Sequence, residues 1–300
     1  MIGFLHTALN FVFCRINGHH IQNVTAEMEH FSNFMQPHEE IIIQRHIDSC
    51  IPFYGMSMFI FYFTTISTII IKPAMSNQTF PTIAEYPFDV YYQPLKAIIY
   101  IHQSIVGLIM AAQLCTNIFM ALLLWFASAR FEILIERIRK ITNVYQLFKC
   151  IKKHQELLNY ARKVATVAGP FAFLSTCCST IGLITVFLLW VTNQPIITII
   201  LSFGLVLISL TEVFMYIWPA EYLIYTSEDV GQAVFDMLEH NYFIGIWKYL
   251  QIIIMRSQKP VNVSIPCLLP ALSYHYFTSY LSTVLSYFTT LRIMMTDDKN

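Results

Sequence analysis

The sequence predicts an all-α fold, a polytopic transmembrane helical bundle whose helices extend into the cytoplasm. Its composition is 56% hydrophobic and 12% charged, whereas soluble domains have about 25% charged residues. Residues 164–211 contain no Asp, Glu, Lys or Arg, and this run has room for two helices that each need roughly 20 apolar residues to cross a bilayer. Uncharged runs also occupy residues 51–71, 97–129 and 260–291. Runs of this length do not alternate as barrel strands do, so helices are favoured.

The rest of the composition excludes several classes of protein. The formal net charge is +0, so no basic surface for nucleic acid is expected. The 7 Cys residues are scattered without a CxxC spacing, which predicts neither a metal centre nor a disulfide framework. The sequence has 9 Gly residues and no phosphate-loop, serine-hydrolase or zinc-protease motif. We therefore expect neither an enzyme nor a bound cofactor.

The N-terminal segment differs from the later apolar runs. Residues 1–14 are apolar but too few for a full crossing. Arg15 and a polar stretch through residue 48 follow them. The segment lacks the basic start and the small-residue cleavage site that would indicate a signal peptide. We expect residues 1–14 to be the end of a shortened membrane helix and residues 15–48 to be cytoplasmic.

The basic residues indicate the orientation of the chain. Residues 130–163 carry half of the 18 Lys and Arg residues, and such cations are enriched in cytoplasmic loops. Residues 73–95 carry no Lys or Arg, so this loop is expected outside. It contains Asn77-Gln78-Thr79, an acceptor sequence for N-glycosylation. Asn77 is therefore the predicted glycosylation site.

The remaining elements follow from alternation between the two sides of the membrane. We expect four membrane helices with cytoplasmic extensions in residues 49–225 and an amphipathic cytoplasmic helix in residues 226–259. A last membrane helix is expected in residues 260–295 and an extracellular tail in residues 296–300. This alternation places the C-terminus outside.

One acidic residue, Glu212, falls inside a predicted membrane helix. If that helix begins at Pro195, a rise of 1.5 Å per residue places Glu212 about 25 Å along the axis. This position is close to the expected cytoplasmic surface. We therefore expect a solvated acid at a helix end rather than an ion site.

Three short motifs resemble the insect odorant receptor family. They are Tyr280–Arg292 in the last predicted helix, Glu221–Ala233 after the helix that starts at Pro195, and Glu85–Lys96 in the predicted outer loop. The related gustatory receptors end their last helix with a Thr-Tyr pattern followed by Gln-Phe. Here Ser286-Tyr287 is followed by Thr290-Leu291-Arg292, so the odorant branch is favoured.

The resemblance implies a ligand-gated, nonselective cation channel with seven membrane helices. Its expected partners are a small volatile odorant, membrane lipid and a shared odorant co-receptor subunit, with which it forms a heterotetramer. The expected location is the plasma membrane of sensory neuron dendrites. Residues 1–14 are then a remnant of the second helix, residues 49–225 hold helices three to six, and residues 260–295 hold the pore-lining helix. The implied pore residues are Thr290 and Met294, four positions apart on one helix face, where a ring of Met side chains can gate by dewetting.

The odorant pocket implied by the resemblance lies in the outer halves of the helices, because volatile ligands offer mainly apolar surface. Polar side chains inside a span are costly unless they face a cavity or a partner helix. The predicted ligand-binding residues are Phe61, Thr64, Tyr100, Ser104, Leu108, Tyr276 and Tyr280. Ordinary core packing remains an alternative for each aromatic residue. The hydroxyl groups of the last helix are compatible with either helix packing or a wet lumen.

Three alternative functions remain open: a gustatory-type chemoreceptor, a G-protein-coupled receptor and a secondary transporter. A G-protein-coupled receptor has its N-terminus outside, opposite to the side that the basic loop indicates. A transporter is expected to contain inverted repeats with paired broken helices, and the sequence shows no such repeat.

Overall fold

The computed structural model describes residues 2–75, 80–81, 86–87, 90, 92–192, 196–240 and 247–297. This part of the chain contains helices and no β-strand, which confirms the all-α prediction. In chain order the helices are α1 (Ile2–Ile16), α2 (Gly18–Asn33), α3 (Pro37–Met75), α4 (Leu95–Arg139), α5 (Val144–Val191), α6 (Ile196–His240), α7 (Trp247–Ser257) and α8 (Tyr274–Asp297).

Four helices in the described part are long and apolar enough to cross a membrane. The candidate spans are Pro37–Ile71, Leu95–Arg139, Val144–Val191 and Ser202–Met237. Each has at least 35 residues, whereas a crossing needs roughly 20, so each helix also extends beyond the lipid. These features confirm a transmembrane helical bundle with helix extensions. The last helix, α8, is not among the four, since Ser, Thr and Tyr residues interrupt its apolar sequence.

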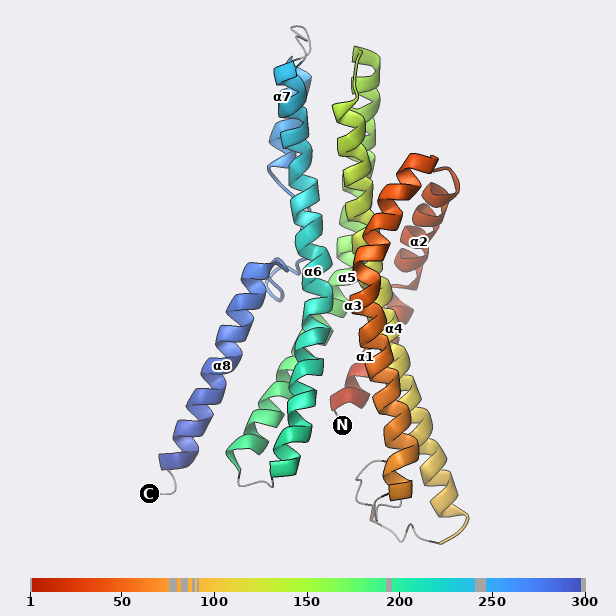
Figure 1. The fold of residues 1–300 in the computed structure, drawn as a ribbon, viewed down its shortest axis with the longest axis vertical. Helices are drawn as coiled ribbons and strands as arrows, with labels where there is room; N and C mark the ends of the chain where they lie inside the picture. Colours follow the sequence, from red (N-terminus) through yellow and green to blue (C-terminus); the bar gives the residue numbers. More distant parts are fainter. Residues whose placement is uncertain are drawn as a thin grey trace.

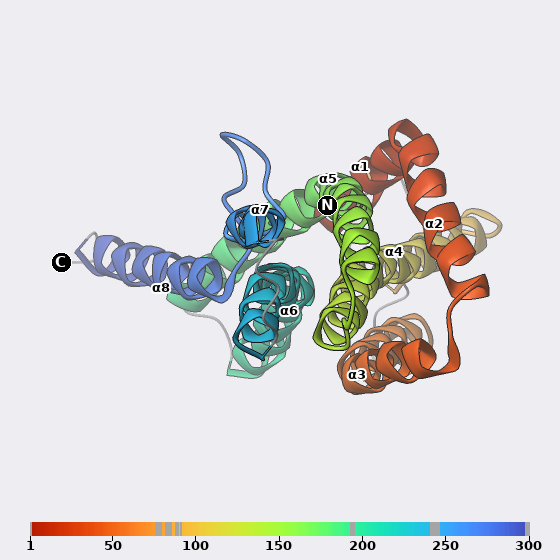
Figure 2. The same cartoon turned by 90° about the horizontal axis from the view of Figure 1, so that it is seen from above.

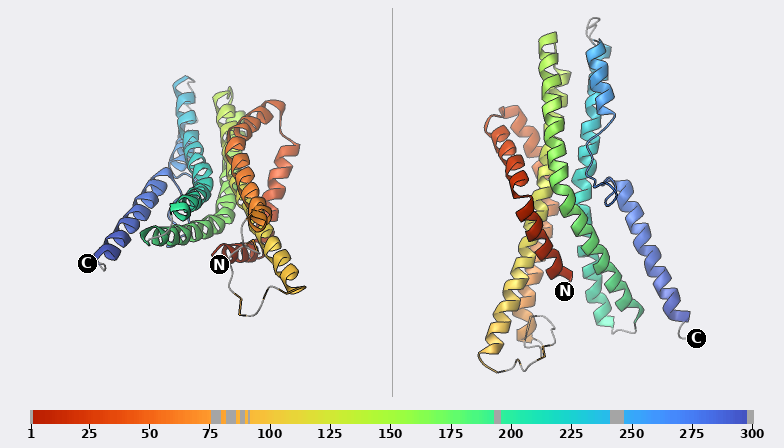
Figure 3. Two further views of the ribbon diagram at one scale, coloured as in Figure 1. Left: turned by 60° about the horizontal axis from the view of Figure 1, so that its bottom comes forward. Right: turned by 180° about the vertical axis from the view of Figure 1, so that it is seen from behind.

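The helices α4, α5 and α6 pack against one another in the centre of the molecule. The helix α3 packs on α4, whereas α8 packs mainly on α5, so α3 and α8 lie on opposite sides of the centre (Figures 1 and 2). The end of α3, the start of α4, the end of α5, the start of α6 and the end of α8 lie at one end of the bundle (Figures 1 and 3). The α4–α5 turn and α7 lie at the other end. The sequence predicts the same grouping of ends, with the α4–α5 turn in the cytoplasm.

The last helix begins at Tyr274 rather than at residue 260, which corrects the predicted boundary. Pro266 and Pro270 interrupt the preceding segment, and proline has no backbone N–H for a helical hydrogen bond. The segment forms an isolated antiparallel bridge between Ile265 and Leu269 instead. The hydroxyl of Ser273 then accepts a hydrogen bond from the backbone N–H of Tyr276 at 3.1 Å, which satisfies a free donor in the first turn of the helix.

The helix α6 continues to His240, and α7 packs back against it. A Cβ atom at Gly231 of α6 would lie 3.1 Å from Ser257 Cβ at the end of α7, so glycine permits this close crossing. The hydroxyl of Ser227, one turn earlier, accepts a hydrogen bond from Val261 N at 3.0 Å. Two small residues of the Glu221–Ala233 motif therefore position the chain after α6.

Ion pairs connect the N-terminal helices to α4 and α5 in the half of the bundle that contains the α4–α5 turn. Glu39 of α3, which is buried, pairs with Arg137 of α4. Glu27 of α2 lies 3.2 Å from Lys163 of α5 and 4.0 Å from Arg130 of α4. These pairs hold α2 and α3 against the central helices.

The guanidinium of Arg130 lies between aromatic rings at the same level. Its Cζ atom is 4.5 Å from the Phe31 ring centroid and 4.4 Å from the Tyr160 ring centroid. A cation over ring faces at this distance is stabilised electrostatically. A carboxylate contact also joins α3 to α4, since His46 and Arg45 of α3 both approach Glu132 of α4.

Candidate functional site

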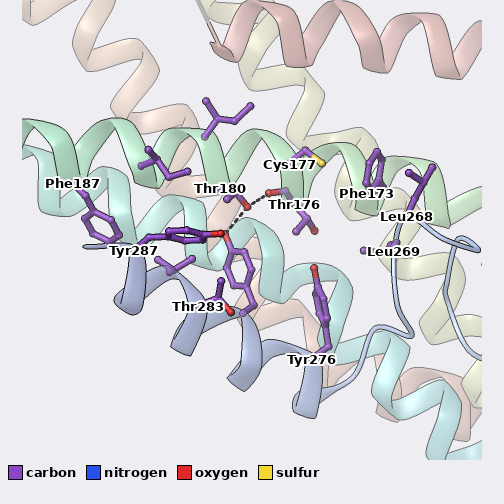
Figure 4. Close-up of a pocket in the computed structure, with 14 residues that line it drawn as sticks. Phe173, Thr176, Cys177, Thr180, Phe187, Leu268, Leu269, Tyr276, Thr283 and Tyr287 are labelled. Carbon is purple, nitrogen blue, oxygen red and sulfur yellow. Dashed lines mark hydrogen bonds between the residues drawn. The ribbon is translucent and has the colours of Figure 1, made fainter. Parts of the chain in front are cut away.

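A cavity of about 400 Å³ lies between α5 and α8 (Figure 4). Helix α5 supplies Phe173, Thr176, Cys177, Thr180, Ile181, Ile184 and Phe187, the segment before α8 supplies Leu268 and Leu269, and α8 supplies Tyr276, Tyr280, Thr283, Val284 and Tyr287. The walls are therefore mainly apolar and aromatic, with several hydroxyl groups. Small-molecule sites have this chemistry and volumes of about 300–1,000 Å³.

The hydroxyl groups of the cavity join its two walls. Thr180 Oγ1 of α5 lies 3.2 Å from the Tyr280 hydroxyl of α8 and donates to the Thr176 carbonyl at 2.7 Å. The rings of Tyr276 and Tyr280 stack with centroids 6.4 Å apart. In Figure 4 the labelled Thr180, Tyr276 and Thr283 side chains project into the space between the helices. A ligand in this space would contact α5 and α8 together.

Two of the seven predicted ligand-binding residues, Tyr276 and Tyr280, line this cavity. The other five belong to α3 and α4, on the opposite side of α6 from α8 (Figures 1 and 2). The structure therefore does not bring the seven together into one pocket of this chain. A ligand role for each of them stays a prediction.

The five residues on α3 and α4 have local packing roles. Tyr100 donates a hydrogen bond to the Ile69 carbonyl at 3.0 Å, and Ser104 donates to the Tyr100 carbonyl at 2.8 Å. Phe61 packs against the buried cluster that contains Tyr54. The remaining two, Thr64 and Leu108, are exposed at the surface of the bundle. An α3–α4 contact thus accounts for the Tyr100 hydroxyl, and a bond within α4 accounts for the Ser104 hydroxyl.

A buried polar cluster, which we call the polar core, lies where α1, α4, α5 and α6 meet. Its centre is Glu212 of α6, which corrects the expectation of a solvated acid at a helix end. Asn117 Nδ2 donates to Glu212 Oε1 at 3.1 Å, and Ser179 Oγ donates to Glu212 Oε2 at 3.0 Å. The reason for the error is that α6 extends to His240, so Glu212 lies well inside the helix and faces its neighbours.

The polar core continues from Glu212 to α1. His6 Nδ1 lies 3.6 Å from Glu212 Oε1 and 2.9 Å from Gln113 Nε2. Thr7 Oγ1 donates to Gln113 Oε1 at 2.6 Å. The side-chain amide of Gln113 therefore lies between Thr7 and His6 and connects α4 to α1.

One member of the polar core has no hydrogen-bond partner among the described residues. Asn10 is 3% exposed, and neither its Nδ2 nor its Oδ1 atom has a partner there. Tyr216 of α6 is satisfied in contrast, since its hydroxyl donates to Asn117 Oδ1 at 3.1 Å. Buried amide groups without partners are rare and costly, so Asn10 needs a structural or functional reason.

Four pairs of polar residues with helical spacing in the sequence could have indicated the polar core. Each helix contributes two polar residues four positions apart, which lie on one face. The pairs are His6 and Asn10 on α1, Gln113 and Asn117 on α4, Ser175 and Ser179 on α5, and Glu212 and Tyr216 on α6. Together they indicate four helix faces that need polar partners inside the bundle.

The predicted pore residues lie on the outer face of α8. Thr290 is exposed and Met294 is 62% exposed, so this face has no partner from the described part of the chain. The predicted glycosylation site, Asn77, lies outside the described residues. Most of the predicted tail, residues 298–300, lies outside them too.

Comparisons with known proteins agree with the helical arrangement. Residues 1–289 match the family described as 7tm odorant receptor. The chain is 25% identical over 148 residues to odorant receptor Or2 of Anopheles gambiae, a match that covers 49% of this chain and 39% of that receptor. The chain therefore spans well under two thirds of the length of this curated relative.

Solved structures of the olfactory receptor OR5 from Machilis hrabei share the fold. The complex with eugenol gives a TM-score of 0.79 at 15% identity, over 97% of this chain and 78% of that chain. The structure described without eugenol gives a TM-score of 0.77 at 15% identity, with the same coverage. The relatives found are receptors, which agrees with the expectation that the chain is not an enzyme.

Proposed function

Because the chain belongs to the 7tm odorant receptor family, we propose that it is an odorant receptor subunit of the plasma membrane that binds a small volatile ligand. The ligand gates a nonselective cation channel, which the chain forms with a shared co-receptor in a heterotetramer of sensory neuron dendrites. The observation that carries this proposal is the cavity between α5 and α8, since one of its walls is the helix with the predicted pore residues.

The chemistry of the cavity suits a volatile compound. Its aromatic and aliphatic walls favour apolar surface through the hydrophobic effect. The hydroxyl groups of Thr180, Tyr280 and Thr283 orient a ligand that has one polar group. Tyr276 and Tyr280 are the predicted ligand residues in this cavity. Phe61, Thr64, Tyr100, Ser104 and Leu108 form a second candidate region between α3 and α4.

Ligand binding in the cavity acts on the pore through α8. A ligand shifts a conformational equilibrium only if it binds one state more tightly. One that bridges α5 and α8 favours the state in which the two helices are spaced to hold it. Thr290 and Met294 lie further along α8, so they move with the helix. Copies of Met294 around a shared axis then widen or close a hydrophobic constriction.

The outer face of α8 supports a position beside water. Ser279, Ser282, Ser286, Thr289 and Thr290 are exposed there. Two of these hydroxyls, those of Thr289 and Thr290, donate to the Ser286 carbonyl, each at 2.9 Å. A face of this composition suits a wet lumen better than contact with lipid chains.

Filling the cavity tests the proposed site. The receptor is co-expressed with the co-receptor, and cation currents are recorded against a broad panel of odorants. The substitution Thr283→Trp places an indole in the cavity and is expected to raise the half-maximal odorant concentration at least tenfold. The matched control is Leu285→Trp, because Leu285 is 59% exposed and lies outside the cavity.

Two results would contradict the proposal. In the first, Thr283→Trp reaches the surface with an unchanged odorant response, whereas Phe61→Ala or Ser104→Ala loses the odorant response. This result would place the ligand in the region between α3 and α4. A surface-delivered receptor that gives no current with any odorant contradicts the channel function itself.

A further inference from the structure

We propose that the ligands of this receptor include protonated amines whose ammonium group is held by the polar core around Glu212. This inference rests on the proposed function and adds the chemical class of the ligand. The apolar part of the amine occupies the cavity between α5 and α8, and its head reaches the Glu212 carboxylate.

The first argument is the charge of Glu212. Its hydrogen-bond donors, Asn117 and Ser179, are uncharged. The nearest titratable neighbour is His6, whose Nδ1 atom lies 2.9 Å from Gln113 Nε2 and whose Nε2 atom lies 3.4 Å from Ser175 Oγ. The His6 Nδ1 atom is 3.6 Å from Glu212 Oε1, which is beyond the usual length of a hydrogen bond. The described residues therefore give Glu212 no positive partner at hydrogen-bond distance.

An acidic group at this depth needs a counter-charge or a proton. Ionisable side chains inside a membrane bundle are costly unless they are paired. A ligand ammonium supplies the missing charge and three N–H donors. An alcohol supplies one donor and no charge, and an alkane supplies neither. The site therefore discriminates in favour of an amine.

The second argument is access to the carboxylate. The side chain of Glu212 is 21% exposed, whereas Asn117 and Ser179 beside it are 1% and 3% exposed. The carboxylate of Glu212 therefore keeps accessible surface, whereas Asn117 and Ser179 keep almost none. A small head group can approach the acid at this surface.

The third argument is continuity with the cavity. Ser179 and Thr180 are adjacent on α5: Ser179 bonds to Glu212, and Thr180 lines the cavity and contacts Tyr280. Adjacent side chains on a helix point about 100° apart, so the polar core and the cavity lie on neighbouring faces of α5.

The fourth argument is the unsatisfied amide of Asn10. Asn10 lies one turn beyond His6 on the same face of α1, and His6 contacts Glu212. Its Oδ1 atom is a buried acceptor without a partner among the residues that the structure describes. An ammonium group held between Glu212 and this face of α1 offers a donor to the oxygen.

The test compares ligands that differ only in the head group. Straight-chain amines from butyl to octyl are applied to the receptor with its co-receptor, each beside the alcohol and the alkane of matching length. A charged hydrogen bond in a buried site contributes about tenfold or more in affinity. We therefore expect the best amine to act at least tenfold more potently than its alcohol. Equal potency of amine, alcohol and alkane throughout the series overturns the inference.

The substitution Glu212→Gln keeps the shape and removes the charge. It is expected to raise the half-maximal concentration of the best amine at least tenfold and that of the matching alcohol by less than threefold. Glu136→Gln is the matched control, because Glu136 is at the surface in an ion pair with Lys140, and it is expected to change neither value. An equal shift for amine and alcohol in Glu212→Gln indicates a structural role only and overturns the inference.

Surface labelling accompanies each variant. If Glu212→Gln fails to reach the surface, the wild-type comparison of amine, alcohol and alkane decides the inference alone. Failure of the amine proposal leaves odorant currents intact. Failure of the proposed function removes the currents for every class of ligand, so the two results are distinguishable.

Discussion

The two halves of the bundle stabilise their polar side chains in different ways. In the half that contains the α4–α5 turn, acids pair with cations, as Glu39 does with Arg137 and Glu27 with Lys163. In the polar core, the acid Glu212 is bonded by an amide and a hydroxyl instead. The difference follows the surroundings. A charge near water has a small desolvation cost, whereas a charge within the bilayer has a large one and is surrounded here by neutral donors. A polar core without a cation is therefore open to a cationic ligand.

The largest effect is expected at the ion-paired end. Glu39→Ala leaves the partly buried Arg137 without its partner, and breaking a buried pair costs about 3 kcal/mol or more. The measurement is the free energy of unfolding of the purified receptor complex in detergent. Glu136→Ala is the control and is expected to cost less than about 1 kcal/mol, since the pair with Lys140 is exposed. Equal losses for both variants would show that burial does not separate the two pairs.

A smaller loss is expected in the polar core. Asn117→Leu removes the donor to Glu212 and the acceptor for Tyr216. Leaving a buried polar group unpartnered costs about 1–3 kcal/mol. The same unfolding measurement in detergent tests this value. A variant as stable as the parent would mean that water replaces Asn117 and that the polar core is wetter than the structure indicates.

The smallest effect has the opposite sign. Asn10→Leu replaces an unpartnered buried amide by an apolar side chain of similar size and is expected to stabilise the protein by about 1 kcal/mol. The measurement compares the free energies of unfolding of the parent receptor and Asn10→Leu, both without ligand. A loss of stability would show that Asn10 has a partner in the ligand-free protein, which would remove one argument for amine binding. The neighbouring Thr7→Val serves as the control, since it removes a bond that is made and is expected to destabilise.

The sequence was sufficient for the fold class and for the family. Only helices and closed barrels span lipid, and long apolar runs without alternation favour helices; this reasoning needs no contacts between elements. The start of α8 was less accessible, because the uncharged run extends through Pro266 and Pro270 into residues that are not helical. Charge alone does not distinguish a membrane helix from a buried apolar segment.

The polar core illustrates what the sequence left open. The position of Glu212 was inferred from a helix that ended near the membrane surface, whereas α6 continues to His240. The pairs at helical spacing are readable one helix at a time, but which faces meet depends on the packing of α1, α4, α5 and α6. The cavity could not be predicted for the same reason, since Tyr276 and Tyr280 line it only because α8 lies beside Thr180.

The most direct test of the account is water access to Met294 during gating. Met294→Cys is co-expressed with the co-receptor, and a charged, water-soluble thiol reagent is applied with and without odorant. Because the predicted pore face of α8 widens on activation, we expect loss of most of the current, faster when odorant is present, while the unsubstituted receptor with its natural cysteines keeps its current. An odorant-gated Met294→Cys receptor whose current the reagent leaves unchanged in both conditions would contradict a pore lined by α8.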